Sequence, residues 1–392
     1  MRIIQPTKEC SACGACVDAC PKGAISIKED KKGYLYPIIN QPKCISCGMC
    51  SKVCANEKKD DKKDFVPTAY IARTYDKERY DISASGGIFG TLASEFIKSN
   101  GIVYGAAIIN EGNTLNCKHI RVEALDKLHT IQGSKYVHSE TQGIYACVLK
   151  DLTDGKKVLF SGTSCQVAAL NCFLGKHYDN LFTVDLVCHG VPPISMFHKY
   201  IHYLEKKNKY QINNISFRKK GKPGFDLDKD SYVITLFLNK DNEPFEKYIS
   251  SRYSGYYSLF RARAGYRPNC YICRYASIKK QGDITLGDFV PRGNEFDKYK
   301  LSDKNMYSTI LVNNDHGKNL FNTISNHCFY SEIDIETVMR HHANLSNPSK
   351  CGRKGKIMMH IYRGFSFAGL EIYLGILTKV RRIYHLIQRK GI

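Results

Sequence analysis

The sequence predicts a chain of two parts, a small α+β module at the N-terminus followed by a larger α/β body with a mainly parallel sheet. Two cysteine runs of the same spacing lie within residues 1–57. A run of charged residues at 57–64 then separates them from the rest of the chain. From Thr68 onward, strand-like and helix-like segments alternate, which is typical of βαβ units. With 392 residues, the chain is long enough for two or three domains.

Both cysteine runs follow the pattern C-x-x-C-x-x-C-x-x-x-C. The first comprises Cys10, Cys13, Cys16 and Cys20, and the second comprises Cys44, Cys47, Cys50 and Cys54. Three thiolates so close together can bind three irons of one cubane, and the fourth, after a longer gap, reaches the neighbouring cluster. The pattern therefore predicts two [4Fe-4S] clusters, one bound by Cys10, Cys13, Cys16 and Cys54 and the other by Cys44, Cys47, Cys50 and Cys20.

Two other uses of these cysteines fit less well. Zinc knuckles usually offer their ligands as separated pairs, and a disulfide between cysteines three residues apart is strained. Residues 1–57 are therefore predicted to form a dicluster ferredoxin domain of bacterial type. Residues 24–27 and 34–39 flank a turn-prone segment, and we expect them to form a small hairpin between the two cysteine runs.

The composition narrows the class of protein. The chain has 58 Lys and Arg against 37 Asp and Glu, a net charge of +21, which suits nucleic acid, an anionic membrane surface, or acidic cofactors and proteins. It has no Trp, no RNP run and no Cys/His finger, so we do not expect nucleic acid as a partner. The first cysteine, Cys10, leaves no room for an apolar targeting segment. Clustered thiols without an export signal favour metal chemistry in a reducing cytoplasm.

The body divides into predicted elements and regions. Buried strands are expected at residues 101–109, 156–162, 181–188, 283–289 and 308–314, with helices at 89–98, after Ser164 and at 195–205. Residues 212–248 alternate in shorter runs, as in antiparallel strands or a peripheral insertion. We therefore expect a charged linker at 58–67, two regions of one body at 68–155 and 156–350, and a basic tail at 351–392.

The tail ends in a predicted amphipathic helix at residues 370–390. One side carries Ile372, Tyr373, Ile376, Val380, Ile383, Tyr384 and Ile387. We expect this stripe to dock against the body, since apolar stripes on helices usually do so. Peripheral contact with an anionic membrane surface is the alternative. No segment approaches the ~18 apolar residues needed to span a bilayer.

Three glycine-rich turns recur at strand ends in the body, at residues 83–90, 131–139 and 161–166. Each on its own is most often tight-turn chemistry. Together, their exposed backbone N–H groups and helix N-termini predict a cradle for a pyrophosphate-bearing cofactor. None of them is a G-x-G-x-x-G or P-loop motif. The candidate cofactor residues are Ser85, Gly86, Gly87, Gly133, Ser134, Lys135, Tyr136, Gly162 and Thr163.

Four more cysteines lie near these turns or in a basic segment: Cys165, Cys188, Cys270 and Cys273. The last two form a C-x-x-C pair among Arg261, Arg263, Arg267 and Arg274. Cationic neighbours favour thiolates and offset the charge of a reduced cluster or a bound phosphate. From spacing alone, the pair could be a zinc half-site, a redox dithiol or half of a cluster site.

These motifs make the chain recognisable. In their order along the chain, S-A-S-G-G-I-F-G-T-L, Q-G-S-K-Y-V, F-S-G-T-S-C-Q, D-L-V-C-H-G, N-C-Y-I-C-R and G-D-I-T-L-G-D-F resemble the coenzyme F-420 hydrogenase/dehydrogenase beta-subunit family, in a form with a fused ferredoxin. One departure is Ser164, where relatives often carry Pro. The resemblance implies an α/β flavin-binding body with FAD and a third [4Fe-4S] cluster bound by Cys165, Cys188, Cys270 and Cys273.

The resemblance also implies a function, an iron–sulfur flavoprotein oxidoreductase that passes electrons between a soluble donor or acceptor protein and a deazaflavin coenzyme or another small acceptor. Bacterial relatives often accompany enzymes of surface-polysaccharide biosynthesis, which suggests a role there. The alternatives are an electron-transfer subunit that serves a catalytic partner, and a zinc-stabilised basic protein that binds nucleic acid. His138 and His189 are the proton-donor candidates nearest the motifs, but we expect both to be structural and assign no catalytic residue. A homo-oligomer is compatible with each of these functions.

Overall fold

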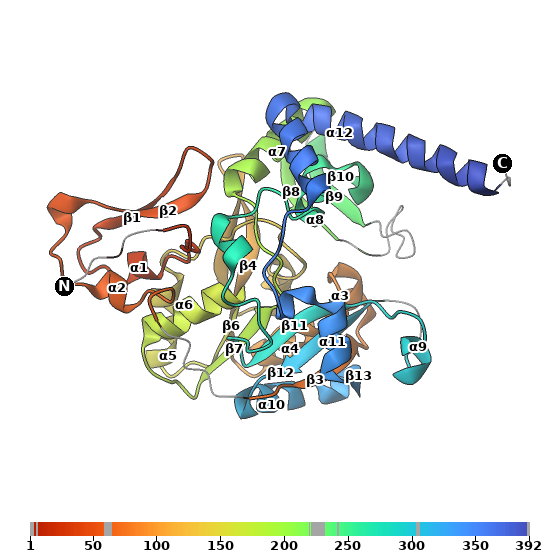
Figure 1. Cartoon of the computed structure of the whole chain (residues 1–392). Coiled ribbons are helices and arrows are strands. Elements are labelled where there is room, and N and C mark those ends of the chain that lie inside the picture. The colour runs from red at the N-terminus through yellow and green to blue at the C-terminus, as the bar shows by residue number, and fades with distance from the viewer. Residues whose placement is uncertain are drawn as a thin grey trace.

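The computed structural model describes residue 4 and residues 7–58, 65–218, 220, 232–240, 243–302 and 306–389. The N-terminal module lies at one end of a body built on a large mixed sheet, and a long C-terminal helix projects from the other end (Figure 1). Part of the predicted linker, residues 59–64, falls outside the described residues.

The N-terminal module contains the predicted hairpin and two short helices. Strand β1 (Ile25–Glu29) pairs antiparallel with β2 (Leu35–Ile39). Helices α1 (Ala15–Asp18) and α2 (Met49–Lys52) begin after Gly14 and Gly48, whose φ angles are 78° and 72°. Only glycine adopts this left-handed conformation without strain. The sequence repeat is thus also a structural repeat, with one short helix in each cysteine run.

The body is built on an eight-stranded sheet in the order β13-β3-β12-β11-β7-β6-β4-β5. Strands β4, β6, β7 and β11 are mutually parallel and form its centre, and the flanking pairs are antiparallel. The predicted fold class is confirmed, with its parallel strands at the centre. The strands are β3 (Thr68–Thr74), β4 (Ile102–Glu111), β5 (Thr114–Val122), β6 (Val158–Ser161), β7 (Leu181–Leu186), β11 (Ile284–Phe289), β12 (Tyr307–Val312) and β13 (Cys328–Glu332).

The described residues of the predicted peripheral segment form a smaller antiparallel sheet. Its order is β10-β9-β8, and α7, α8 and α12 pack around it in one hydrophobic cluster. The strands are β8 (Ile212–Ser216), β9 (Val233–Lys240) and β10 (Glu243–Ser250). The helices of the body are α3 (Lys77–Ile82), α4 (Ile88–Lys98), α5 (Ile144–Thr153), α6 (Ser164–Leu174), α7 (Ile194–Asn208), α8 (Gly255–Arg261), α9 (Glu295–Lys298), α10 (Asp315–Asn322), α11 (Ile335–His341) and α12 (Arg353–Arg389), with 3-10 turns that include η2 (Leu125–Thr130) and η4 (Pro268–Ile272).

The N-terminal module shares a hydrophobic core with the body. Ala15 and Val53 are buried in the same cluster as Tyr104, Tyr145 and Val148. Polar contacts reinforce this packing: the carboxylate of Asp18 accepts hydrogen bonds from the backbone nitrogens of Gly143 (2.6 Å) and Tyr145 (3.1 Å). Gly143 is the N-cap of α5 and has no side chain for this purpose. A residue of the ferredoxin module therefore caps a helix of the body.

The C-terminal helix differs from the prediction in which of its faces packs. It begins at Arg353, well before residue 370, and is interrupted at Ser366 (φ 57°, ψ −162°). Phe367, Leu370 and Leu374 pack against the body. Of the stripe that we expected to dock, Tyr373 is half-buried against the body, whereas Ile372, Ile376 and Val380 are exposed. None of the described helices combines the length and apolar character that crossing a bilayer requires.

The Asp18 cap leads to a prediction about the joint between module and body. Asp18→Ala should lower the free energy of unfolding by about 1–2 kcal/mol, since it removes the N-cap of α5. Amide hydrogen exchange should speed up at Gly143 and Tyr145, which lose their acceptor. Glu29→Ala, which removes an exposed carboxylate of the same module, is the control. Equal stability and exchange in both variants would show that the module docks without this cap.

Candidate functional site

The cysteines of the second run surround a small cavity in the N-terminal module. Its lining includes Cys44, Cys47 and Cys50, together with Cys20 from the first run. The apolar side chains of Ile25 and Ile39 complete one wall. The structure thus brings together the four thiols that the sequence assigns to one cluster, including the crossed ligand Cys20.

The other four cysteines of the module also lie together. Burial is the main cause that raises the pKa of the Cys16 thiol, and negative charge on Cys13, Cys10 and Cys54 raises it further. The pKa of Cys10 is raised by burial too, with a smaller contribution from Cys54. Cys54 is therefore close to the first run, as crossed ligation requires. Buried thiols that oppose each other's ionisation are stabilised as thiolates only when cations such as iron bind them.

The thiol groups do not favour single zinc ions. In the described part of the chain, no three histidine, cysteine or carboxylate side chains converge on the position of one ion. A tetrahedral zinc site needs such convergence. A cubane instead binds its thiolates at four different irons, so its ligands stand further apart.

A third set of thiols comes together from three segments of the body. Cys165 lies in the first turn of α6, Cys188 follows β7, and Cys270 and Cys273 belong to η4 and the residue after it. Burial raises the pKa of Cys188 to about 12, with added effects from Cys270 and Cys273. Burial likewise raises the pKa of Cys270 to about 12, and Cys165 and Cys273 contribute. All four line the large cavity of the body.

This third set lies beside the inner cysteines of the N-terminal module. Burial raises the pKa of Cys165, and the charge of Cys13 adds to the effect. The backbone at Cys13 is held by the body, because the hydroxyl of Thr141 donates to its carbonyl oxygen (2.5 Å). Arg267 donates to the carbonyl oxygen of Cys10 (3.0 Å). The set around Cys10 is thus the inner one of the module, next to the body.

The large cavity has a volume of about 560 Å³. Pockets for cofactors and drug-sized ligands have volumes of about 300–1,000 Å³. All but one of the candidate cofactor residues line it: Ser85, Gly87, Gly133, Ser134, Lys135, Tyr136, Gly162 and Thr163. The three glycine-rich turns therefore face one common space, next to the third set of thiols.

Gly86 is the candidate that does not line the cavity. A Cβ atom at this position would meet the carbonyl oxygen of Ala72 on β3 and the backbone nitrogen of Ser308 on β12. Glycine is needed here so that the turn can approach the sheet, rather than so that a phosphate can approach the turn. Gly133 lines the cavity with a φ of 76°, the left-handed conformation that favours glycine.

Two helix N-termini open into the cavity. Helix α4 begins after Gly87 (φ 83°), and no side chain caps its first turn. At α6, Thr163 and Gln166 form a capping box, and the backbone N–H of Thr163 donates to the Gln166 side chain at 2.9 Å. The N-terminus of α4 thus keeps backbone N–H groups available, in an arrangement that binds phosphate well.

The charge of the cavity wall is strongly positive. Asp288 is the one acidic side chain among the described residues that line it. Its carboxylate pairs with Arg218 at 2.5 Å, and Arg218 outweighs burial to hold the pKa of Asp288 below its usual value. The basic side chains of the wall are Lys135, Arg218, Arg261, Arg263, Arg267, Lys280 and Arg292. Such a wall favours an anionic ligand.

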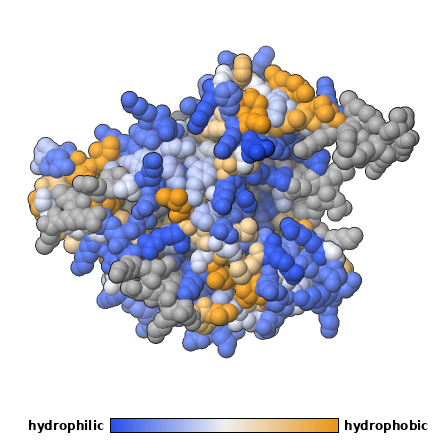
Figure 2. Space-filling view, in the orientation of Figure 1, coloured by the Kyte–Doolittle hydropathy of each residue, from blue (hydrophilic) through white to orange (hydrophobic). Residues whose placement is uncertain are grey.

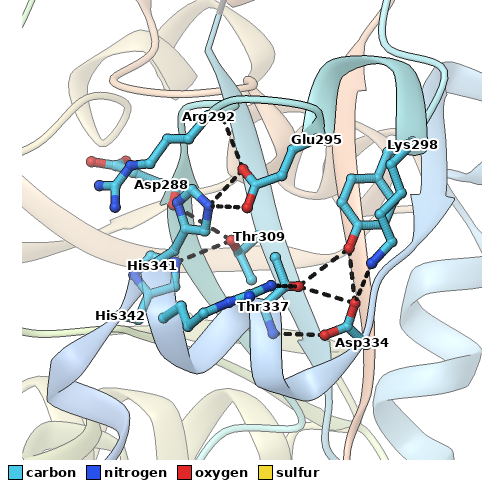
Figure 3. Close-up of polar contacts among 11 residues, drawn as sticks. Asp288, Arg292, Glu295, Lys298, Thr309, Asp334, Thr337, His341 and His342 are labelled. Atoms are coloured by element: carbon cyan, nitrogen blue, oxygen red, sulfur yellow. Dashed lines mark hydrogen bonds and ion pairs between the residues drawn. The ribbon is translucent and has the colours of Figure 1, made fainter.

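Two adjacent histidines of α11 and the loop after it border the cavity at Asp288 (Figure 3). His341 contacts the Glu295 carboxylate at 2.9 Å, and Nε2 of His342 lies 3.1 Å from the hydroxyl of Thr309. Burial lowers the pKa of His342 to about 4, so its imidazole is neutral at pH 7. The sequence analysis missed this group because no spacing links Asp288 with residues 341–342.

Three further histidines line the cavity: His119, His138 and His189. Nε2 of His119 lies 3.0 Å from the carbonyl oxygen of Ser161, while its Nδ1 has no partner among the described residues. Burial lowers the pKa of His119 to about 4 and that of His138 to about 3. Both rings are neutral at pH 7. His119 was not among the residues predicted from the sequence. Its side chain is nevertheless on the same face of β5 as that of buried Cys117, two residues earlier.

Comparison with known proteins identifies two regions of the chain. Residues 155–337 match the family model for the C-terminal part of the coenzyme F420 hydrogenase/dehydrogenase beta subunit. Residues 9–57 match a 4Fe-4S dicluster domain. The predicted resemblance, with its fused ferredoxin, is therefore confirmed. Residues 155–337 are thus similar to the C-terminal part of that beta subunit, and residues 9–57 to an iron–sulfur dicluster domain.

Other comparisons are more distant. No curated protein matches the chain. Among solved structures, a chain of the F420-reducing [NiFe] hydrogenase complex from Methanosarcina barkeri is 14% identical, with a TM-score of 0.45, and the match covers 74% of this chain and 92% of that one. This likeness is too remote to carry an inference.

Crossed ligation in the dicluster domain can be tested at Cys20. Cys20→Ala should remove iron from the cluster of Cys44, Cys47 and Cys50 while the other cluster keeps its spectrum, because only the former loses a ligand. Electron paramagnetic resonance of the reduced protein, compared with Cys16→Ala, assigns the two signals. Cys147→Ala, at an exposed cysteine of α5, is the control. Selective loss of the Cys16 cluster in Cys20→Ala would contradict the assignment.

Lys135 gives the cavity a predicted pH dependence. Burial lowers its pKa to about 8, so the ammonium form is present below that pH and is lost as the pH rises through it. If the cavity binds FAD, as the resemblance implies, its affinity for FAD should decrease between pH 7 and 9.5. A bound pyrophosphate stabilises the ammonium charge and shifts this decrease to higher pH. Fluorescence titration of flavin-free protein measures it.

Two variants control for other effects of pH. Lys135→Arg should keep high affinity across the range because the guanidinium stays charged. Lys135→Met should bind weakly at both ends. A parent-like pH profile in Lys135→Met would exclude Lys135 from the binding of the anion.

Proposed function

We propose that this chain is an iron–sulfur flavoprotein oxidoreductase that passes electrons between a ferredoxin-type protein and a small anionic acceptor through Fe–S clusters and FAD. One observation carries the proposal: a single basic cavity borders both the third set of cysteines and the three glycine-rich turns. The residues suit FAD, since the uncapped N-terminus of α4 and Lys135 can neutralise a pyrophosphate. They suit a third [4Fe-4S] cluster, since four mutually close thiols meet beside Lys280 and Arg267.

The positions of the cysteine sets give an order for electron transfer. The set around Cys44 is outermost, the set around Cys10 contacts the body, and the set around Cys165 borders the cavity. When bound, clusters carry single electrons, and FAD collects two of them with a proton and releases a hydride. The protein's part is to fix these distances and to keep water from the thiols. Thr141 and Arg267 help to fix the distances, because they donate hydrogen bonds to the backbone carbonyls of Cys13 and Cys10.

The acceptor end of the cavity is the region of Asp288, Arg218 and the two histidines of Figure 3. Arg218 and Arg292 favour an acceptor that carries negative charge. A deazaflavin coenzyme and other conjugated anions share this chemistry. The role in surface-polysaccharide biosynthesis stays a prediction from the resemblance.

A second candidate function is an electron-transfer subunit that acts only with a catalytic partner. The family description, which names a subunit, favours it. Turnover by the purified chain, with an artificial reductant and candidate acceptors, distinguishes the two, because a subunit without a substrate of its own is inactive alone.

The three-cluster scheme is tested by counting iron and flavin after anaerobic purification. The parent chain should hold about twelve irons and one FAD, since each cubane contains four irons. Cys273→Ser should lose about four of these irons and keep FAD, and reduction of the flavin through the ferredoxin module should become much slower.

Cys172→Ser, at a half-buried cysteine outside the proposed ligand set, is the matched control. Unchanged iron content in Cys273→Ser, or flavin reduction at the parental rate, would contradict the third cluster. Iron-replete protein without FAD would contradict the flavin assignment alone.

A further inference from the structure

Helix α12 carries a second apolar face that points away from the body. Leu370 and Leu374 are 0% and 7% exposed, whereas Ile372 and Ile376 are 66% and 57% exposed. Residues two positions apart lie about 200° apart around a helix, so the two pairs occupy opposite sides. Together with Val380, which is 57% exposed, Ile372 and Ile376 form what we call the outer face. Apolar atoms gather along α12 in the upper part of Figure 2.

The outer face is a continuous stripe rather than a scatter of single residues. Ile372, Ile376 and Val380 follow one another at intervals of four residues, which places them in one row along the helix. Isolated apolar residues on a surface are ordinary, but a contiguous stripe usually marks an interaction site. This part of the helix also projects away from the rest of the molecule, which leaves its outer side accessible along its length (Figure 1).

The charge along the same segment is entirely positive. Glu371 is the last acidic residue of the chain, and its carboxylate is engaged by Lys207 and Tyr203 at 2.7 Å. The sequence after it contains Lys379, Arg381, Arg382, Arg389 and Lys390. Lys379 is exposed next to Val380. An apolar stripe thus accompanies a cluster of positive charge with no acid to offset it.

We propose that the outer face of α12 lies in the interface of an anionic lipid bilayer. Such a surface offers an apolar layer for the stripe and negative headgroups for the basic residues. A second copy of the chain is a poorer occupant, since two stretches with the same positive charge repel each other. In this proposal the helix lies on the membrane rather than across it, because its described part has no apolar stretch long enough to cross a bilayer.

The absence of tryptophan from the chain allows a direct measurement. Ile376→Trp places a sole tryptophan on the outer face. Its emission should shift to the blue when vesicles of phosphatidylcholine with about 30% phosphatidylglycerol are added, and not with phosphatidylcholine alone, because basic residues need the anionic lipid. Leu125→Trp, at a 47% exposed position on η2, should show no shift. No shift in Ile376→Trp overturns the proposal.

Vesicle sedimentation of the full chain provides the second measurement. Ile372→Gln/Ile376→Gln should weaken binding at least about tenfold, since two apolar side chains leave the lipid. The matched control Val66→Gln/Leu125→Gln changes two apolar residues of similar exposure elsewhere and should sediment like the parent. Equal sedimentation of both double variants overturns the proposal. So does a parent dimer in lipid-free solution that Ile372→Gln/Ile376→Gln dissociates, because a second copy would then occupy the stripe.

Discussion

The buried guanidinium of Arg267 is the interaction on which the arrangement of the three thiol sets depends. The residue is 1% exposed and donates to the carbonyl oxygens of Cys10 (3.0 Å) and Leu35 (2.9 Å) in the N-terminal module. Arg267 lies three residues before Cys270, and its backbone N–H donates a hydrogen bond to the carbonyl oxygen of Val191. One side chain thus fixes the inner cysteine loop of the module against the loop that carries the C-x-x-C pair.

Burying this cation is costly unless negative charge compensates it. In the described structure the compensation comes from the carbonyl dipoles of Cys10 and Leu35. Arg267 in turn favours ionisation of Cys10 and Cys270, although burial has the stronger effect and raises the pKa of each thiol. The same balance extends through the cavity, where basic side chains far outnumber the single carboxylate of Asp288 among the described lining residues. Positive charge near a redox group stabilises its reduced, more negative form and so raises its potential.

The sequence predicted those features that depend on the spacing of residues within short segments. Crossed ligation in the dicluster domain depends on local spacing, and a glycine-rich turn before a helix is visible in the chain. The group of Arg218, Asp288 and His342 was not predictable, because these residues meet only through the folding of distant strands. Gly86 shows the opposite error, since a glycine that matches the motif serves the packing of strands. For α12, both sides are apolar, and periodicity cannot say which side meets the body.

The shared core of the two parts couples the packing of the body to the folding of the N-terminal module, which we expect to depend on iron. A dicluster domain of this size has little core of its own, and structural metal sites supply folding energy to such domains. Because Ala15 and Val53 belong to the cluster around Tyr145 and Asp18 caps α5, we expect unfolding of the module without iron to remove all three from the body. Incomplete chains therefore expose apolar surface and a frayed helix, which are the features that chaperones and proteases recognise. We therefore expect the contacts between module and body to form fully only in chains that have bound iron, so that iron-free chains are removed before they take part in electron transfer.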